Sequence, residues 1–271
     1  MIKKTLFWIV TVIVLLTIIM PLLWIYLTAF KSQNDIFSTN LVRQIVFRPT
    51  LRNFSELFSS YTFWPNLLNT AIVSVGSTLL TMFVALLAAY SFARWNTGRG
   101  DLLFVTISTR MFPAAVAAIP YFVIYKTFGL LDTHVGLMLL YTFFNMSFAT
   151  FLLYGFFNEV PREVEQAAMI DGYGRTEIIR KIVFPLIKPG LAVTSVFCLI
   201  WSWNEFFYAF LFTRSVARTV NVLLSSFWGG VQVTYGLMTA GAAITIMPTL
   251  LAAWFMQRYI IRGLTFGAVK G

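Results

Sequence analysis

Polar and aromatic side chains crowd one short stretch of an otherwise apolar segment near residue 200. The stretch holds Trp203, Asn204, Glu205 and Tyr208. An ionisable side chain inside a membrane-crossing helix is costly, so it usually faces the interior of a bundle or a water-filled cavity. Aromatic faces beside amide and carboxylate groups also suit a sugar ring and its hydroxyls. These four residues, with Asn145 on an earlier apolar segment, are therefore candidates for a pathway or gate.

A structural role for the same side chains is the alternative. The stretch could lie at the outer membrane interface, where tryptophans anchor a helix and Asn204 and Glu205 meet water. Asn145 could line a path or only hydrogen-bond between helices. Arg110, a further ionisable residue in an apolar segment, could pair with an acidic group or with carbonyls of a neighbouring helix. Both kinds of role stay open at this point.

No pattern in the sequence predicts catalysis or a metal site. Cys198 is the single cysteine and lies in an apolar run, which predicts a packing role. His134 is the single histidine, and because no second ligand stands at metal-binding spacing, it is predicted to be solvated. No G-x-x-x-x-G-K-[ST] phosphate-binding loop occurs. We therefore expect no catalytic residue, no metal and no ATP bound by this chain.

The elements that position these residues are predicted to be membrane-spanning helices. The chain has 271 residues, 59% hydrophobic and 11% charged, whereas a soluble domain is about 25% charged. Its apolar runs exceed the roughly 18–20 residues that cross about 30 Å of hydrocarbon as a helix, and they lack the alternation of a β-barrel. The first run has a basic end like a signal peptide, but it is too long and is expected to remain as a span. The predicted fold class is all-α, a polytopic transmembrane helical bundle.

Six spans are predicted, and charge predicts their orientation. The spans are at about 6–30, 67–93, 102–126, 135–157, 190–213 and 239–261. Pro113 and Pro120 suggest that the third is kinked and faces protein. Twelve Lys and Arg lie on the side of the termini and seven on the other, so both termini are predicted to be cytoplasmic. These charges occur in short blocks rather than on one basic face, so the net charge of +10 does not indicate nucleic-acid binding.

Three parts are expected along the chain. They are a first helix with an external loop (1–65), a five-helix core with a cytoplasmic loop at 158–189 (66–261), and a cytoplasmic tail (262–271). Residues 31–66 could form a small amphipathic cap on the outer surface. Residues 214–238, interrupted by Gly229 and Gly230, fit a short interfacial or re-entrant piece better than a seventh span, which would place the basic C-terminus outside.

The cytoplasmic loop predicts two helices joined by a glycine turn. Asn158 is expected to cap the first helix, with Pro161 in its first turn, and Gly172 to end it in the left-handed conformation. The second helix is predicted at 175–183, ending before Pro185. A solvated connector is one interpretation. Docking is the other, because connections are usually only about 4–6 residues long and small side chains beside a glycine suit a groove of another protein.

The loop resembles the EAA loop of ATP-binding-cassette importer membrane subunits. Gln166-Ala167-Ala168, Gly172 and Ile182-Val183-Phe184-Pro185 match the spacing of that pattern, E-A-A, three residues, G, nine residues, I-x-L-P. Gln166 replaces the usual Glu, keeping its length but not its charge, and Phe184 replaces Leu. Segments 110–120, 201–213 and 262–271 are similar to the carbohydrate branch, including the maltose-type subunit with the tail G-L-T-x-G-A-V-K-G.

The resemblance implies a permease subunit that imports a sugar or polyol and is not itself an enzyme. In that family each EAA loop forms a coupling helix that docks on a cytoplasmic ATPase subunit, and ATP is bound there. The implied ATPase-coupling residues are Gln166, Ala167, Ala168, Gly172, Ile182 and Pro185, and the implied tail contacts with the ATPase are Thr265, Gly267 and Lys270. The implied partners are a second permease subunit in a heterodimer, two ATPase subunits and an external substrate-binding protein. The implied location is a bacterial or archaeal cytoplasmic membrane.

Two other function classes compete with this interpretation. A secondary transporter or channel acting without an ATPase would be expected to show repeat symmetry or several charges in its spans, and only Arg110 and Glu205 are candidates. A membrane-embedded enzyme would need a convergent set of polar residues that the sequence does not display. Neither class explains the helix-glycine-helix loop.

Overall fold

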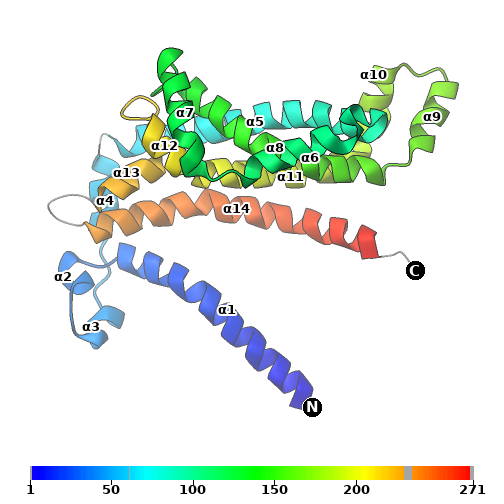
Figure 1. Ribbon diagram of the computed structural model, residues 1–271. Helices are drawn as coiled ribbons and strands as arrows, with labels where there is room; N and C mark the ends of the chain where they lie inside the picture. The colour runs from blue at the N-terminus through cyan, green and yellow to red at the C-terminus, as the bar shows by residue number, and fades with distance from the viewer. Residues whose placement is uncertain (1, 61, 229–233, 269–271) are drawn as a thin grey trace. The chain divides into compact units, whose positions relative to one another are not determined.

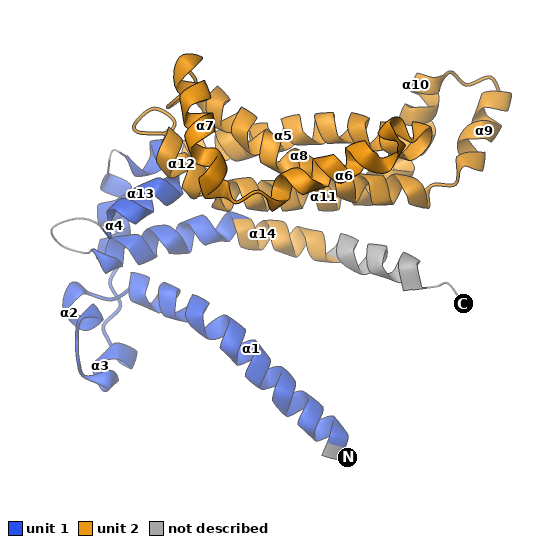
Figure 2. Cartoon of the chain, viewed as in Figure 1, with its two compact units in different colours: residues 1–67, 220–248 blue, residues 68–219, 249–271 orange. Residues whose placement is uncertain are grey.

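A computed structural model describes residues 2–60, 62–228 and 234–268, and over these residues every regular element is a helix (Figure 1). The chain forms two compact units (Figure 2). Unit 1 contains residues 1–67 and 220–248, and unit 2 contains 68–219 and 249–271. The all-α prediction is confirmed. Residues 220–248 group with the N-terminal segment, whereas the sequence division placed them in the core.

Five helices are long and apolar enough to cross a membrane, and a bent pair raises this to six. The five are Lys3–Ala29, Phe63–Trp95, His134–Glu159, Arg175–Asn204 and Tyr235–Gln257. They belong to α1 (Ile2–Ala29), α5 (Phe63–Trp95), α8 (His134–Glu159), the α10 to α11 run and α14 (Tyr235–Ala268). The count over the described residues agrees with the predicted six spans if the bent pair is one span.

The third span is broken rather than kinked. Its first half is η1 (Thr97–Gly100), α6 (Asp101–Ser108) and η2 (Thr109–Met111), and its second half is α7 (Ala114–Thr127). The two halves meet at 97°. Phe112 has extended backbone (ψ 129°) because the ring of Pro113 disfavours a helical conformation in the preceding residue. The expectation of one helix over 102–126 was therefore wrong.

The fifth span also differs from its prediction. α10 (Arg175–Ile178), the π-helical turn η3 (Ile179–Val183) and α11 (Phe184–Asn204) run on as one helix, so the predicted end before Pro185 was wrong. Pro185 has no N–H for a regular helical hydrogen bond, and the π-helical turn just before it lets the helix continue through this residue. The helix ends at Asn204 rather than near 213, because Glu205 is extended (ψ 129°), and a separate helix, α12 (Phe207–Phe212), follows.

In unit 1, the segment predicted as a cap contains three short helices. These are α2 (Gln33–Ile36), α3 (Leu41–Ile45) and α4 (Arg52–Ser59). Asn53 fastens α4 to the end of α1 by donating from Nδ2 to the carbonyls of Ala29 (2.8 Å) and Lys31 (2.9 Å). α13 (Val220–Ser226) has seven residues, far fewer than a span needs. A short piece was thus predicted correctly, while Gly229 and Gly230 lie outside the described residues.

Unit 2 is organised by close packing of α5, α8 and α11. α5 presents Ala85, Ala89 and Ala93, each at most 2% exposed, one turn apart along one face. Small residues at this spacing let helix backbones approach closely. Leu153 and Phe157 of α8 pack in the same cluster, and α8 contacts α11. Ala168, Ile178 and Val183 of the predicted loop pack in the same core.

One carboxylate fastens the α7–α8 loop to the segment after α12. Asp132, with φ +55°, accepts hydrogen bonds from the backbone N–H groups of residues 214–217 at 3.0–3.3 Å. Beside it, Nε2 of His134 lies 2.7 Å from Oδ1 of Asn69, whose Nδ2 donates to the carbonyl of Val216 (2.9 Å). His134 therefore belongs to a polar network, and its prediction as merely solvated was wrong.

Acidification is expected to weaken this connection. Partial burial raises the pKa of Asp132, but hydrogen bonds from the four backbone N–H groups outweigh it and lower the pKa from 3.8 to about 2. Since the folded pKa lies below the unfolded one, the stabilisation is complete above about pH 4 and is lost as the pH falls through about 2. It amounts to at most about 2 kcal/mol, because a partly exposed group is screened by solvent. Thermal unfolding in detergent should show a steeper loss of stability below about pH 4 for wild type than for Asp132→Asn, and identical profiles would contradict the prediction.

Candidate functional site

The loop between α8 and α11 folds as a helix, a glycine turn and a second helix. α9 (Arg162–Ile170) begins after Pro161, because α8 continues to Glu159 and keeps Asn158 inside it. The predicted cap at Asn158 was therefore wrong. Gly172 has φ +87°, and the N–H of Tyr173 donates to the carbonyl of Ala168 at 3.0 Å. The predicted left-handed glycine after the helix is confirmed.

The two alanines of the loop point in different directions. Ala168 is 4% exposed and packs in the unit 2 core with Ile178 and Val183. Ala167 and Gln166 are exposed instead. Consequently the small side chains before Gly172 do not form one docking surface, since Ala168 is covered by the chain itself.

Other candidate coupling residues are also distributed between core and surface. Ile182 is half-buried against the core, while Gly172 and Pro185 are exposed. Ile170 is 87% exposed, a large apolar side chain that sequence reasoning did not single out. Among the exposed residues of α9, we call Gln166, Ala167 and Ile170 the α9 face.

A buried ion pair anchors α9 to α5. Nε of Arg94 lies 2.5 Å from Oε1 of Glu165, and both side chains are 7% exposed. The hydroxyl of Tyr90 donates to Oε2 at 2.9 Å, and Nη2 of Arg94 donates to the carbonyl of Val160 at 3.0 Å. Arg162 of α9 donates from Nη2 to the carbonyl of Ala93 at 2.7 Å. These contacts thus fix α9 to the end of α5.

Sequence reasoning missed this pair. Glu165 precedes Ala168 by three residues, so helical periodicity places both on one face of α9. That spacing could have indicated that Glu165 faces inward. Its partner Arg94 is 71 residues earlier in the sequence, and nothing local identifies it.

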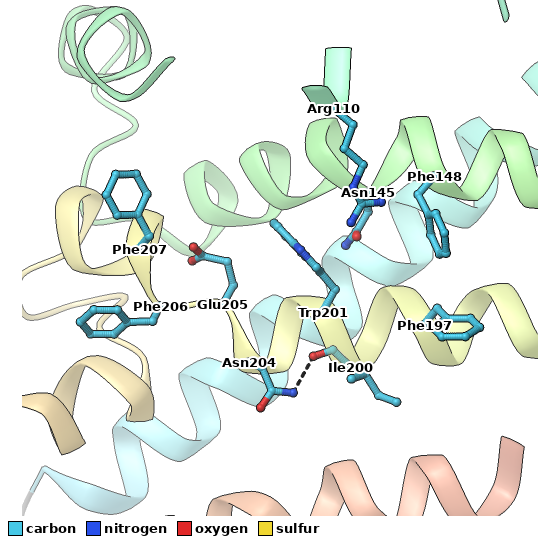
Figure 3. A pocket seen from close by; sticks show the side chains of 10 residues that line it. All are labelled: Arg110, Asn145, Phe148, Phe197, Ile200, Trp201, Asn204, Glu205, Phe206 and Phe207. Carbon is cyan, nitrogen blue, oxygen red and sulfur yellow. Dashed lines mark hydrogen bonds between the residues drawn. The ribbon is translucent and has the colours of Figure 1, made fainter. Parts of the chain in front are cut away.

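A second candidate site is a cavity of about 630 Å³ in unit 2 (Figure 3). It is lined by Arg110, Asn145, Phe148, Phe197, Ile200, Trp201, Asn204, Glu205, Phe206 and Phe207. Of the predicted pathway residues, Asn145, Asn204 and Glu205 lie here. Trp203 and Tyr208 are buried, at 9% and 2% exposed, and do not line it. Trp201 and the phenylalanines also line the cavity, although they were not among the predicted pathway residues.

Glu205 has a structural role in this site. Its Oε1 accepts from the N–H of Tyr208 (2.8 Å), and its Oε2 accepts from the hydroxyl of Tyr141 (2.8 Å) and the N–H of Ala209 (3.1 Å). The carboxylate therefore caps the start of α12 and joins it to α8. Tyr208 is held by stacking on Phe144, with ring centres 4.6 Å apart.

Asn145 makes the predicted hydrogen bonds between helices and also lines the cavity. Its Nδ2 donates across to α11, to Oγ of Ser202 (2.9 Å) and to the carbonyl of Cys198 (3.4 Å). Arg110 lies over the ring of Phe148, 4.9 Å from the ring centre, so its described contact is aromatic, whereas an acidic group or carbonyls of a neighbouring helix were predicted. In the C-terminal tail, the side chain of Thr265 and the whole of Lys270 lie outside the described residues, and the backbone of Gly267 belongs to α14.

Comparison with known proteins identifies the family. Residues 81–265 match the family described as "Binding-protein-dependent transport system inner membrane component". This range includes the loop and the cavity. The chain belongs to this family. It is the membrane component of a binding-protein-dependent transport system rather than an enzyme, and the resemblance noted in the loop is confirmed.

Two curated relatives match this chain over nearly its whole length. It is 31% identical to the sulfoquinovosyl glycerol transport system permease protein SmoH of Agrobacterium fabrum, covering 99% of this chain and 94% of that one. It is 32% identical to the trehalose transport system permease protein SugB of Mycobacterium tuberculosis, covering 93% of each. A solved structure of a bacterial ATP-binding-cassette transporter involved in alginate import has the same fold, with a TM-score of 0.78 at 22% identity over 95% of this chain and 97% of that one.

Proposed function

We propose that this chain forms half of the translocation pathway of an ATP-binding-cassette importer for a sugar or polyol. The family membership supports a transport role. The named cargoes of SmoH and SugB are both carbohydrates. The cavity in unit 2 supports the same cargo class, because its aromatic walls and its amide and cationic groups suit sugar rings and their polar substituents. A secondary transporter without an ATPase is not favoured, since the family is binding-protein-dependent.

Coupling to a cytoplasmic ATPase is proposed to occur through α9. The observation that carries this proposal is the combination of a buried anchor and an exposed face. Glu165 and Ala168 hold α9 against α5 and the core, while the α9 face is uncovered. An exposed apolar side chain such as Ile170 beside small residues suits a groove of another protein.

The complete complex is proposed to contain several further subunits. They are a second, different permease subunit, two ATPase subunits that bind the ATP, and an external substrate-binding protein. Both termini are proposed to be cytoplasmic, in the cytoplasmic membrane of a bacterium or archaeon, and Thr265, Gly267 and Lys270 to contact the ATPase. The lack of a phosphate-binding loop in this sequence supports a separate ATPase.

Substitution of Ala167 by arginine is expected to remove the ATPase from the complex. Ala167 is exposed on α9, so the long charged side chain should block docking without disturbing the fold. The tagged chain is recovered from gently solubilised native membranes, and its partners are identified by mass. Wild type should retain an ATPase and a second permease. With Ala167→Arg, the recovery of the ATPase should fall at least about tenfold, equivalent to about 1.4 kcal/mol of binding free energy.

Ser59→Arg provides the matched control, since Ser59 is exposed on α4 in unit 1. It should retain both partners. Recovery of the wild-type chain without any ATPase, at normal expression, would refute the importer proposal, and equal recovery from Ala167→Arg would refute the α9 face as the docking surface.

A further inference from the structure

The cavity in unit 2 contains a cation without an acidic partner among the described residues. Arg110 ends the first half of the broken third span and lines the cavity. The ion pairs of the described residues are Arg52–Glu56, Arg94–Glu165 and Lys181–Glu177, and none includes it. A charged residue in a span is costly and usually meets a counter-charge or a water-filled path. The non-helical break beside it is likewise expected where a span borders a cavity.

The single acidic residue that lines the cavity is already engaged. Both carboxylate oxygens of Glu205 accept hydrogen bonds from Tyr141 and from the first residues of α12. Figure 3 shows its carboxylate directed toward α12 and away from Arg110. The hydrogen bonds described for Glu205 thus go to α8 and α12.

Asn145 contributes an amide to the same cavity. It is 1% exposed, and its Nδ2 is held by Ser202 and Cys198 of α11. Asn145 therefore fixes α8 to α11 at the cavity wall and brings no charge that could pair with Arg110.

The remaining walls are mainly aromatic. Phe148, Phe197, Trp201, Phe206 and Phe207 line the cavity, and flat apolar faces suit the C–H faces of sugar rings. The volume of about 630 Å³ falls within the roughly 300–1,000 Å³ of small-molecule sites. A cation and aromatic walls together favour a saccharide with a negative charge.

We propose that the transported saccharide carries a carboxylate or sulfonate group that pairs with Arg110 in this cavity. An arginine guanidinium binds such oxyanions through two parallel hydrogen bonds. The sugar rings of the cargo pack against Trp201 and the phenylalanines. This inference rests on the proposed function, because it names the substrate class of the same pathway.

The test measures sugar binding to the chain itself. The protein is purified in detergent with the permease partner it retains and without the external binding protein, so that only the membrane site is probed. Calorimetric titrations use glucuronosyl-glucose and glucosyl-glucose, which differ by one carboxylate. Wild type is expected to bind the acidic disaccharide at least about tenfold more tightly, as charged hydrogen bonds predict.

Three variants make the result specific. Arg110→Gln should lower the affinity for the acidic disaccharide to that of the neutral one and leave the neutral affinity unchanged. Arg110→Lys should keep most of the preference. Arg43→Gln is the control, because Arg43 is an exposed arginine on α3 in unit 1, and it should behave as wild type.

Equal affinity of wild type for the two disaccharides, or no measurable binding of either, would overturn the inference. Loss of the second permease from Arg110→Gln with an unchanged sugar preference would also overturn it, since the partner of Arg110 would then be a carboxylate of that subunit. These outcomes are independent of ATPase recovery, which alone decides the coupling proposal.

Discussion

Glu165→Ala is expected to destabilise the attachment of α9 by about 3–5 kcal/mol and to abolish coupled transport. The variant leaves Arg94 buried without its carboxylate, and removal of one partner from a buried ion pair costs this much. The hydroxyl of Tyr90 loses its acceptor as well. The measurements are thermal unfolding in detergent and, in vesicles with the complete complex, substrate transported per ATP hydrolysed.

An exposed ion pair in the same loop supplies the control. Glu177 and Lys181 lie 2.8 Å apart, but their side chains are 51% and 57% exposed, so Glu177→Ala should change stability and coupling little. A double variant, Arg94→Met with Glu165→Leu, removes both buried charges and should recover part of the stability. If Glu165→Ala and Glu177→Ala behaved alike, the anchoring role of Glu165 would be wrong.

Glu205→Ala is expected to lower the free energy of unfolding by about 3 kcal/mol or more. The substitution leaves the hydroxyl of Tyr141 and the N–H groups of Tyr208 and Ala209 without their acceptor, and each unmet buried donor costs about 1–3 kcal/mol. α12 should then separate from α8 and distort the cavity. Thermal unfolding in detergent measures the loss, with Glu205→Gln expected to fall between the alanine variant and wild type because it keeps one acceptor oxygen.

Asn204→Ala is the control that distinguishes a structural role of Glu205 from a direct contact with cargo. Asn204 is exposed, and its Nδ2 bonds to Ile200 of its own helix (2.7 Å) and to Thr249 (3.3 Å), so Asn204→Ala should be nearly as stable as wild type. Should Glu205→Ala keep wild-type stability and lose only cargo binding, Glu205 would be a direct ligand and the structural assignment would be rejected.

Much of this protein follows from short-range features of its sequence. Span length and composition determine that the chain crosses the membrane as helices, because the polar backbone of an apolar segment must satisfy its own hydrogen bonds in lipid. Gly172 determines the turn after α9, since its φ of +87° is readily reached by glycine. Pro113 determines that the third span breaks near residue 112, through its steric effect on the preceding residue. The spacing of the loop was also sufficient to indicate its family.

Tertiary structure decided what these elements do with their polar side chains. Glu165 lies beside Arg94, 71 residues away, and Glu205 beside Tyr141, 64 residues away. Such pairs depend on how helices pack, which local sequence patterns do not encode. Packing also turned Ala168 inward and left Ala167 exposed, dividing a motif that looked uniform. The carboxylate of Glu205 likewise accepts from the N–H groups at the start of α12, because buried donors need an acceptor within reach. Arg110 lines the cavity for a different reason, namely the way its helix packs.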